Sequence, residues 1–123
     1  KEMIMAGKTI KGAKVLIMGI TFKEDCPDMR NSKVMDIYEE LKDFGTDVDV
    51  YDPWSEASEA KDYYGEKVVD DPLLSPEKYD AIIVAVGHTQ FKEWSITDYE
   101  KISIGEPITI DVKNVVPNPT WRL

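Results

Sequence analysis

Two short runs of almost uninterrupted apolar residues stand out along the chain, "AKVLIMGI" at 13–20 and "YDAIIVAVGH" at 79–88. Runs of this length without alternation are typical of strands that are covered on both faces, as in a parallel sheet. A third stretch, "TDVDVYDP" at 46–53, alternates apolar and polar residues and ends at a proline, which also indicates a strand. "EPITIDVKN" at 106–114 predicts a final strand, and "KVVD" at 67–70 predicts a weak, short one.

Between these strands the apolar residues recur with helical spacing. In the first such stretch they fall at i, i+3, i+4, i+7 and i+10, which predicts an amphipathic helix with these inward positions: Val34, Ile37, Tyr38, Leu41 and Phe44. Asn31 or Ser32 is expected to cap this helix, and Gly45 is expected to end it.

"WSEASEAKDYYG" at 54–65 predicts a second helix with Ser55 as its cap, and "SITDYEKI" at 95–102 predicts a third. "PLLSPEKY" at 72–79 predicts a turn or a single helical turn. The tail "VVPNPTWRL" at 115–123 contains two prolines and is expected to be irregular.

This order of elements predicts an α/β fold with three layers, doubly wound around a mainly parallel, Rossmann-like sheet. The expected folded domain covers residues 13–123. Residues 1–12 are expected to be a lead-in arm from a preceding domain, because the chain begins with Lys1 and not with methionine.

Composition narrows the possible partners of this domain. The 123 residues carry a formal net charge of -9, which argues against broad binding to nucleic acids or to anionic membranes. Cys26 is the only cysteine and His88 the only histidine, so neither an internal disulfide nor a metal site is expected. The single thiol, with no export signal, predicts a cytoplasmic protein.

The loop "GITFKEDCPDMRNSK" at 19–33 stands where a doubly wound fold often has a phosphate-binding glycine loop. Only Gly19 is a glycine here, so the GxGxxG fingerprint of dinucleotide-binding folds is missing. Asp52 follows the second strand, as the ribose-binding acid does in those folds. An Asp-Pro turn that begins the next helix is the favoured interpretation of Asp52.

Side chains of this loop offer another way to hold an anion. Ligands of α/β sheets bind outside the carboxyl ends of the strands, where this loop begins. Lys23 is suited to a phosphate or carboxylate, Arg30 to a bidentate grip on a pyrophosphate, and Phe22 offers a flat apolar face. Pairing of the two cations with Glu24, Asp25 or Asp28 is an equally open alternative.

The same loop, followed by a helix and "VDVYDP", resembles the C-terminal domain of the UDP-glucose/GDP-mannose dehydrogenases. "YDAIIVAVGH" and "ITIDVKN" follow in the order of that domain, and the resemblance covers about residues 13 to 116. "CPDMRNSKV" and "VYDPW" are more similar to the branch that oxidises UDP-N-acetylhexosamines than to the UDP-glucose branch.

The resemblance implies a nucleotide-sugar (UDP)-binding domain of an NAD-dependent 6-dehydrogenase, which oxidises the C6 alcohol of a UDP-sugar to a carboxylate for polysaccharide biosynthesis. Such enzymes have an N-terminal NAD-binding domain and a central dimerisation region, so a homodimer or larger assembly is expected. NAD would be held mainly by the N-terminal domain. The catalytic cysteine, lysine and asparagine of the family would lie upstream, so this fragment is expected to be inactive alone.

Carried over residue by residue, the resemblance assigns Phe22 and Lys23 to the nucleotide sugar and Arg30 to the NAD pyrophosphate. Lys113 falls where the UDP-glucose branch has a substrate-contacting arginine; a solvated lysine is the alternative there. Cys26 is interpreted as a small packing residue and not as the nucleophile. His88 either lines the cleft or is satisfied by backbone groups, and the second is favoured.

Two other functions are compatible with the pattern. One is a free-standing α/β domain that senses a nucleotide, which would need a complete pocket within this chain. The other is an oligomerisation domain with no catalytic role, in which Lys23 and Arg30 would be paired with surface acids. The direction of these two cations distinguishes the hypotheses.

Overall fold

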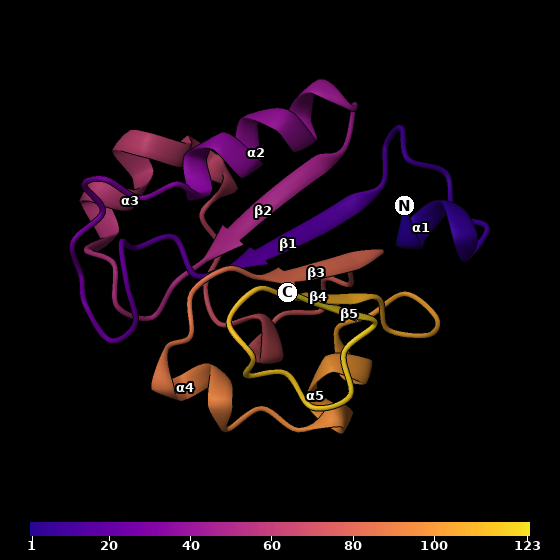
Figure 1. Cartoon of the computed structure of the whole chain (residues 1–123). Coiled ribbons are helices and arrows are strands. Elements are labelled where there is room, and N and C mark those ends of the chain that lie inside the picture. The colour runs from indigo at the N-terminus through magenta and orange to yellow at the C-terminus, as the bar shows by residue number, and fades with distance from the viewer.

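A computed structural model describes the whole chain, residues 1–123. Its centre is one five-stranded sheet in which every strand pair is parallel, in the order β2-β1-β3-β4-β5. Figure 1 shows the strands fanned with the usual twist. The strands are β1 (Lys14–Met18), β2 (Asp47–Tyr51), β3 (Ala81–Val84), β4 (Thr109–Asp111) and β5 (Trp121–Arg122).

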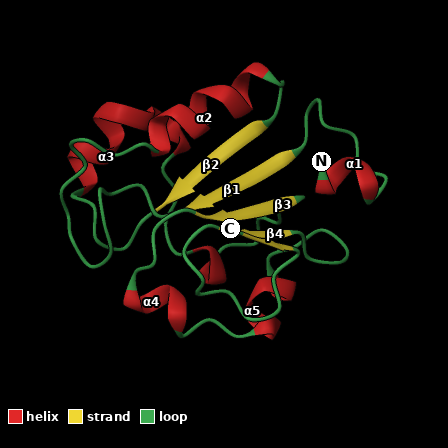
Figure 2. Cartoon of the chain, viewed as in Figure 1, coloured by secondary structure: helices red, strands yellow, loops and turns green.

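Helices cover both faces of this sheet, which makes three layers (Figure 2). On one face lie α2 (Val34–Asp43) and α3 (Ala57–Tyr64); on the other lie α4 (Thr89–Lys92) and α5 (Ile96–Lys101). A short α1 (Glu2–Met5) precedes β1, and two 3₁₀ helices, Gly65–Lys67 and Pro72–Leu74, precede β3. The predicted three-layer, doubly wound α/β class is confirmed.

Alternate residues of β1 point to opposite layers, as the pleat of a strand requires. Val15 and Ile17 join the core under α2 and α3, whereas Leu16 and Met18 join the core over α4 and α5. All four side chains are buried. The uninterrupted apolar run at 13–20 therefore has the cause expected from the sequence, a strand covered on both faces.

The strand order places a reversal of winding next to β1. The chain passes from β1 to β2 on one side and then returns to β3 on the other side. Loops that leave the carboxyl ends of β1 and β3 therefore diverge, and ligands of open α/β sheets bind at such a point. In Figure 1 this edge lies at the left, where the arrowheads of β1 and β2 point toward the long loop before α2.

The first helix keeps most of its predicted positions. Val34 and Tyr38 are buried, whereas Phe44, the last residue of the pattern, is 63% exposed. The N-cap position in the structure is Lys33, whose side chain makes no capping hydrogen bond. Ser32, one of the two expected caps, accepts a hydrogen bond through Oγ from the Val34 N–H at 3.3 Å. Gly45 follows the helix with a φ of 85°, as expected for its end.

Three predictions about secondary structure are wrong. Residues 67–70 form no strand, because only Val68 makes a single bridge, to Val50. The second helix is capped by Glu56 and not by Ser55; the Glu56 carboxylate accepts from the N–H groups of Ser58 and Glu59. The tail is not wholly irregular, because Trp121 and Arg122 form the edge strand β5.

The edge strand depends on Asp111, whose side chain is fully buried at the end of β4. Its carboxylate accepts from the Val116 N–H at 2.9 Å and from Arg122 Nε at 3.2 Å. These bonds hold both ends of the tail against β4. The two prolines of the tail precede the strand, where no ladder hydrogen bond is lost.

The N-terminal segment packs on the domain. Lys8 Nζ donates to the carbonyl oxygens of Asp80 and Ile104, each at 3.0 Å, and Met3 packs against the core under α2. Its helix α1 was not predicted from the sequence. None of the helices in the structure has the length and apolar character needed to cross a bilayer.

Candidate functional site

The candidate site lies at the carboxyl edge of the sheet, where β1, β2 and β3 end. Three segments meet there: the β1–α2 loop (residues 19–33), the turn that begins with Asp52, and the segment from Gly87 to Thr89. Buried hydrogen bonds between these segments fix the shape of the edge, and they converge on two side chains, Asp52 and His88.

Gly19 begins the β1–α2 loop and explains why this loop needs one glycine. Its φ is 97°, and a Cβ at this position would lie 2.6 Å from Val86 Cβ and 2.8 Å from the Val86 backbone nitrogen. No other residue fits without displacing backbone. Gly19 is thus required for the close approach of β1 to the end of β3, and not for contact with a phosphate.

Asp52 is the acceptor that joins the first two segments. Its Oδ2 accepts from the Ile20 N–H at 2.7 Å and from the Thr21 N–H at 3.2 Å, and its Oδ1 accepts from the N–H groups of Trp54 and Ser55. The carboxylate is fully buried. The predicted Asp-Pro turn is confirmed, and the carboxylate that would resemble a ribose ligand is occupied by the protein itself.

Two opposing effects act on the charge of Asp52. Burial raises its pKa, but hydrogen bonds from His88 and from the backbone N–H groups of Ile20 and Trp54 outweigh it. The net result is a pKa below the usual value, so the buried carboxylate is ionised at neutral pH.

His88 joins the third segment to the other two. Its side chain is fully buried, with Nε2 2.8 Å from Asp52 Oδ2 and 3.2 Å from Thr21 Oγ1, while Nδ1 accepts from the Asp25 N–H at 2.9 Å. The imidazole also packs edge-on to Phe91, with ring centroids 5.3 Å apart. His88 is thus satisfied within the protein, by one backbone N–H and by two side chains.

Asp25 completes the connection from the loop side. Its carboxylate accepts from the Thr89 N–H at 2.8 Å and from the Thr89 hydroxyl at 2.5 Å, at the start of α4. These bonds are the main reason why the pKa of Asp25 is lowered. Asp25 also has a φ of 53°, a conformation that is uncommon outside glycine and that the surrounding contacts maintain.

The two residues that the resemblance assigns to the nucleotide sugar lie on the outside of this network. Phe22 is 53% exposed, and Lys23 is exposed and makes no ion pair or side-chain hydrogen bond. Cys26 is half-buried, and its thiol is not part of a disulfide. The loop therefore presents an apolar ring and a cation to solvent.

Arg30, at the other end of the loop, has an acidic partner. Its Nε and Nη2 donate to the two carboxylate oxygens of Asp28, each at 3.0 Å, while the Arg30 side chain stays 80% exposed. These bonds lower the pKa of Asp28. Pairing with an acid, the alternative considered for both cations, occurs for Arg30 and not for Lys23.

Lys113 follows β4 at the same edge. A Cβ added to Gly87 would lie 3.3 Å from the Lys113 Cβ. Lys113 therefore packs against the backbone that follows β3. The Lys113 N–H donates to Asp111 Oδ1, and its side chain is exposed without an acidic partner. Lys23 and Lys113 are thus two unpaired cations at one edge of an acidic domain.

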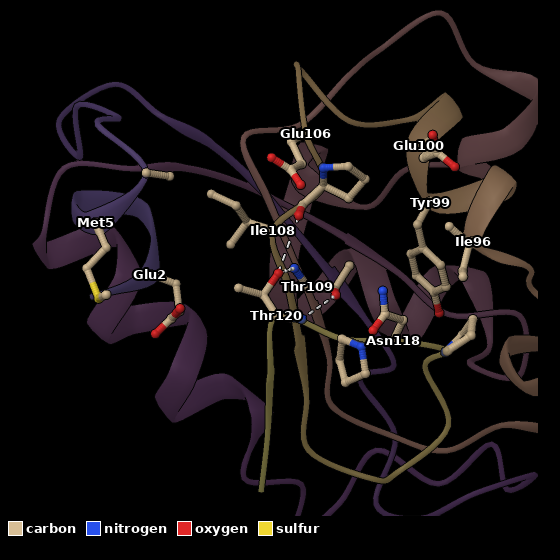
Figure 3. Close-up of a pocket in the computed structure, with 14 residues that line it drawn as sticks. Glu2, Met5, Ile96, Tyr99, Glu100, Glu106, Ile108, Thr109, Asn118 and Thr120 are labelled. Atoms are coloured by element: carbon tan, nitrogen blue, oxygen red, sulfur yellow. Dashed lines mark hydrogen bonds between the residues drawn. The ribbon is translucent and has the colours of Figure 1, made fainter.

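An open hollow of about 640 Å³ lies elsewhere, at the amino ends of β4 and β5 (Figure 3). Glu2, Glu100 and Glu106 line it, together with Pro107, Pro117 and Pro119, and no lysine or arginine does. The only charged side chains that a diphosphate would meet there are negative. The hollow is therefore a poor match for a nucleotide, and the carboxyl edge remains the candidate site.

No group of three or more histidine, cysteine, aspartate or glutamate side chains is placed to hold a metal ion.

The His88–Asp52–Asp25 network could not be found from the sequence, since its members are up to 63 positions apart. The one signal was position, because Asp52 and His88 each follow a predicted strand at its carboxyl end.

Comparisons with known proteins identify the family of this chain. Residues 16–118 match the sequence profile of the UDP-glucose/GDP-mannose dehydrogenase family, UDP binding domain. UDP-N-acetyl-D-glucosamine 6-dehydrogenases of Salmonella typhi and Pseudomonas aeruginosa are 42% and 43% identical, over 95% and 92% of this chain. The crystal structure of an NDP-N-acetyl-D-galactosaminuronic acid dehydrogenase from Methanosarcina mazei superposes on 94% of the chain with a TM-score of 0.80 and 26% identity.

The chain spans only part of these proteins: 27% of the Salmonella relative, 26% of the Pseudomonas relative and 23% of the Methanosarcina structure. The family match, in contrast, includes the β1–α2 loop, Asp52, His88 and Lys113. This chain belongs to the UDP-glucose/GDP-mannose dehydrogenase family, and the part matched is the family's UDP binding domain.

Proposed function

We propose that this chain is the nucleotide-sugar-binding domain of an NAD-dependent 6-dehydrogenase that oxidises the C6 alcohol of a UDP-sugar to the uronic acid. Membership of the family supports the reaction class. The two UDP-N-acetyl-D-glucosamine 6-dehydrogenases at 42% and 43% identity favour a UDP-N-acetylhexosamine over UDP-glucose or GDP-mannose.

The observation that carries the proposal is the state of Lys23. It follows Phe22 on the loop that leaves β1 at the reversal of winding, and it is exposed and unpaired although Glu24 and Asp25 are its neighbours. The Asp25 carboxylate is instead directed to Thr89. An unpaired ammonium at this position is suited to a phosphate group of the nucleotide.

Phe22 and Lys113 extend the same surface. The exposed ring of Phe22 offers an apolar face to the base or sugar, and Lys113 offers a second cation on the far side of Gly87. A lysine at this position lacks the bidentate fork of arginine, which fits a substrate other than UDP-glucose.

Arg30 is the residue of this chain that we assign to the pyrophosphate of NAD. Asp28 accepts from Nε and from one N–H of Nη2, which leaves the two N–H groups of Nη1 and the second N–H of Nη2 as donors on an exposed side chain. The chain has no glycine-rich cradle of its own, so NAD would be held mainly by an N-terminal domain. When bound there, NAD supplies the hydride acceptor.

The proposal includes the architecture of a longer protein. Residues 1–12 would lead from a central dimerisation region into the domain at 13–123, and the full-length enzyme would be a cytoplasmic homodimer or larger assembly. Its uronic acid product would serve polysaccharide biosynthesis. Catalytic residues would lie in the preceding domains.

Titration of the 123-residue chain with UDP, followed by amide chemical shifts, tests the proposal. We expect saturable shifts at Phe22 and Lys23 in the millimolar range or below, and weaker binding of uridine, which lacks the phosphates. Lys23→Ala should weaken UDP about tenfold, because it removes a charge-assisted contact. Lys78→Ala, an exposed lysine just before the amino end of β3, is the matched control. No saturable change with UDP would reject the assignment.

A further inference from the structure

We propose that His88 is a positioning residue for the nucleotide sugar, because its neutral imidazole, protonated at Nε2, holds both sides of the Phe22–Lys23 pair. This inference rests on the proposed function only for the identity of the ligand. The geometry that carries it belongs to the chain itself.

The proton on the imidazole is assigned by a backbone group. The Asp25 N–H can only donate, so Nδ1, 2.9 Å away, must offer its lone pair. The proton of the neutral ring is therefore on Nε2, where it meets the ionised Asp52 Oδ2 at 2.8 Å. Thr21 Oγ1 lies 3.2 Å from the same Nε2 and uses its own proton for the Lys23 carbonyl oxygen at 3.1 Å.

These contacts lie on both sides of the two residues that we assign to the ligand. Thr21 precedes Phe22 and connects Nε2 to the Lys23 carbonyl, whereas Asp25 follows at one residue's distance and is held by Nδ1. One rigid ring therefore fixes the backbone at both ends of a short segment whose side chains are exposed.

The imidazole ring is closely surrounded. It is fully buried between Trp54, with centroids 6.3 Å apart at 30°, and Phe91 at 5.3 Å. Asp52 and Asp25 are the ionisable groups that face it, with Asp25 Oδ1 3.9 Å from Nδ1. A loop ordered in advance binds more tightly, because the entropy of ordering its side chains is not lost on binding.

The first test uses the fact that His88 is the only histidine, so its ring signals are unambiguous. In the ligand-free wild-type chain at neutral pH, imidazole ¹⁵N shifts should show a protonated Nε2 and an unprotonated Nδ1. Heteronuclear relaxation should show Phe22 and Lys23 amides as rigid as those of β1. A proton on Nδ1, or a mobile Phe22–Lys23 pair in the wild type, would overturn the proposal.

Two variants separate positioning from simple packing. His88→Gln keeps a donor near Nε2 and removes the acceptor at Nδ1, whereas His88→Asn keeps an acceptor near Nδ1 for the Asp25 N–H. We expect His88→Gln to raise the mobility of the Phe22–Asp25 amides and to weaken UDP about tenfold, with substantial rescue in His88→Asn. Equal UDP affinity in folded His88→Gln and wild type would contradict the proposal.

Thr21→Val is a third variant for the case that His88→Gln does not fold. It keeps the shape of the buried side chain and removes only the hydroxyl between Nε2 and the Lys23 carbonyl. It should mobilise Lys23 while the Asp25 amide stays rigid; unchanged Lys23 relaxation would contradict the proposal. If the wild type does not bind UDP at all, the proposed function fails, and the tautomer and relaxation measurements still decide the role of His88.

Discussion

Two side chains that look reactive in the sequence, Asp52 and His88, are engaged within the protein, whereas Cys26 is a half-buried free thiol. Asp52 and His88 bind one another, and they bind the backbone of the β1–α2 loop and of the turn after Asp52. The residues left for a ligand are exposed ones, Phe22, Lys23 and Lys113. At the scale of the residue, therefore, buried polar groups build the edge, and the exposed residues are those that we propose to contact the ligand.

Replacement of Asp52 by asparagine tests the energetic weight of this network. The new side chain would have the same shape, but one amide oxygen cannot replace the two charged oxygens that accept from Ile20, Thr21, Trp54, Ser55 and His88. We expect D52N to lower the free energy of unfolding by about 2–4 kcal/mol in urea denaturation. D70N, which removes an exposed carboxylate without hydrogen bonds, is the control and should change it little. Equal stabilities of the two variants would show that the network contributes little.

Asp111 makes stability depend on acid pH. Burial raises its pKa, but the N–H groups of Val116, Val115 and Lys113 and the Arg122 side chain outweigh burial and hold the pKa below its ordinary value. The unfolded state therefore binds this proton first as the pH falls, so the stabilisation is present above about pH 4 and is lost as pH falls through the folded pKa.

The measurement is the free energy of unfolding as a function of pH for the wild type and for D111N. The difference in the free energy of unfolding between the wild type and D111N should be constant near neutral pH. It should become smaller below about pH 4, because only the wild type has a carboxylate whose ionised form stabilises the fold. A difference that stays the same down to about pH 2, below the usual range of carboxyl pKa values, would mean that Asp111 stabilises β5 without its charge.

At the scale of the element, most strands and helices could be predicted because their signal is local. Buried parallel strands and an amphipathic helix are visible in a few consecutive residues, as at 13–20 and 34–44. β5 could not be predicted, because Asp111, the partner of Arg122, lies 11 positions before it and the prolines between them conceal the strand. The candidate loop was identified by its place after β1, but the contacts that shape it come from Asp52 and His88.

Gly19 gives the element-scale prediction. Gly19→Ala should place a methyl group against Val86 and force an alanine into φ near 97°. The control is Gly105→Ala, where φ is 71° and a Cβ would have no neighbour within 4 Å. Both variants have backbone strain, but only Gly19→Ala has a steric clash as well. Each should lose about 1–2 kcal/mol from strain, and Gly19→Ala about 1–3 kcal/mol more from overpacking. Equal midpoints in urea would refute the close contact between β1 and the β3 segment.

At the scale of the molecule, the net charge is negative, while the candidate edge carries two unpaired lysines. The net charge is -9, and the hollow at the amino ends of β4 and β5 is lined by glutamates. Lys23 and Lys113 are unpaired at the opposite edge. Such a surface is expected to exclude nucleic acids generally while it accepts one diphosphate at the edge.

The edge carries the exposed residues that we assign to binding, and the catalytic residues of the proposed enzyme would lie in the preceding domains. We therefore expect the 123-residue chain to form no NADH from NAD⁺ with UDP-N-acetylglucosamine, UDP-N-acetylgalactosamine or UDP-glucose, although it binds UDP. The loop after β1 lacks the glycine-rich cradle that would hold a dinucleotide. The absorbance of NADH measures this, on a sample whose UDP-induced amide shifts show that it is folded. Steady NADH formation that disappears in Cys26→Ser would instead make Cys26 a nucleophile and this domain a complete active site.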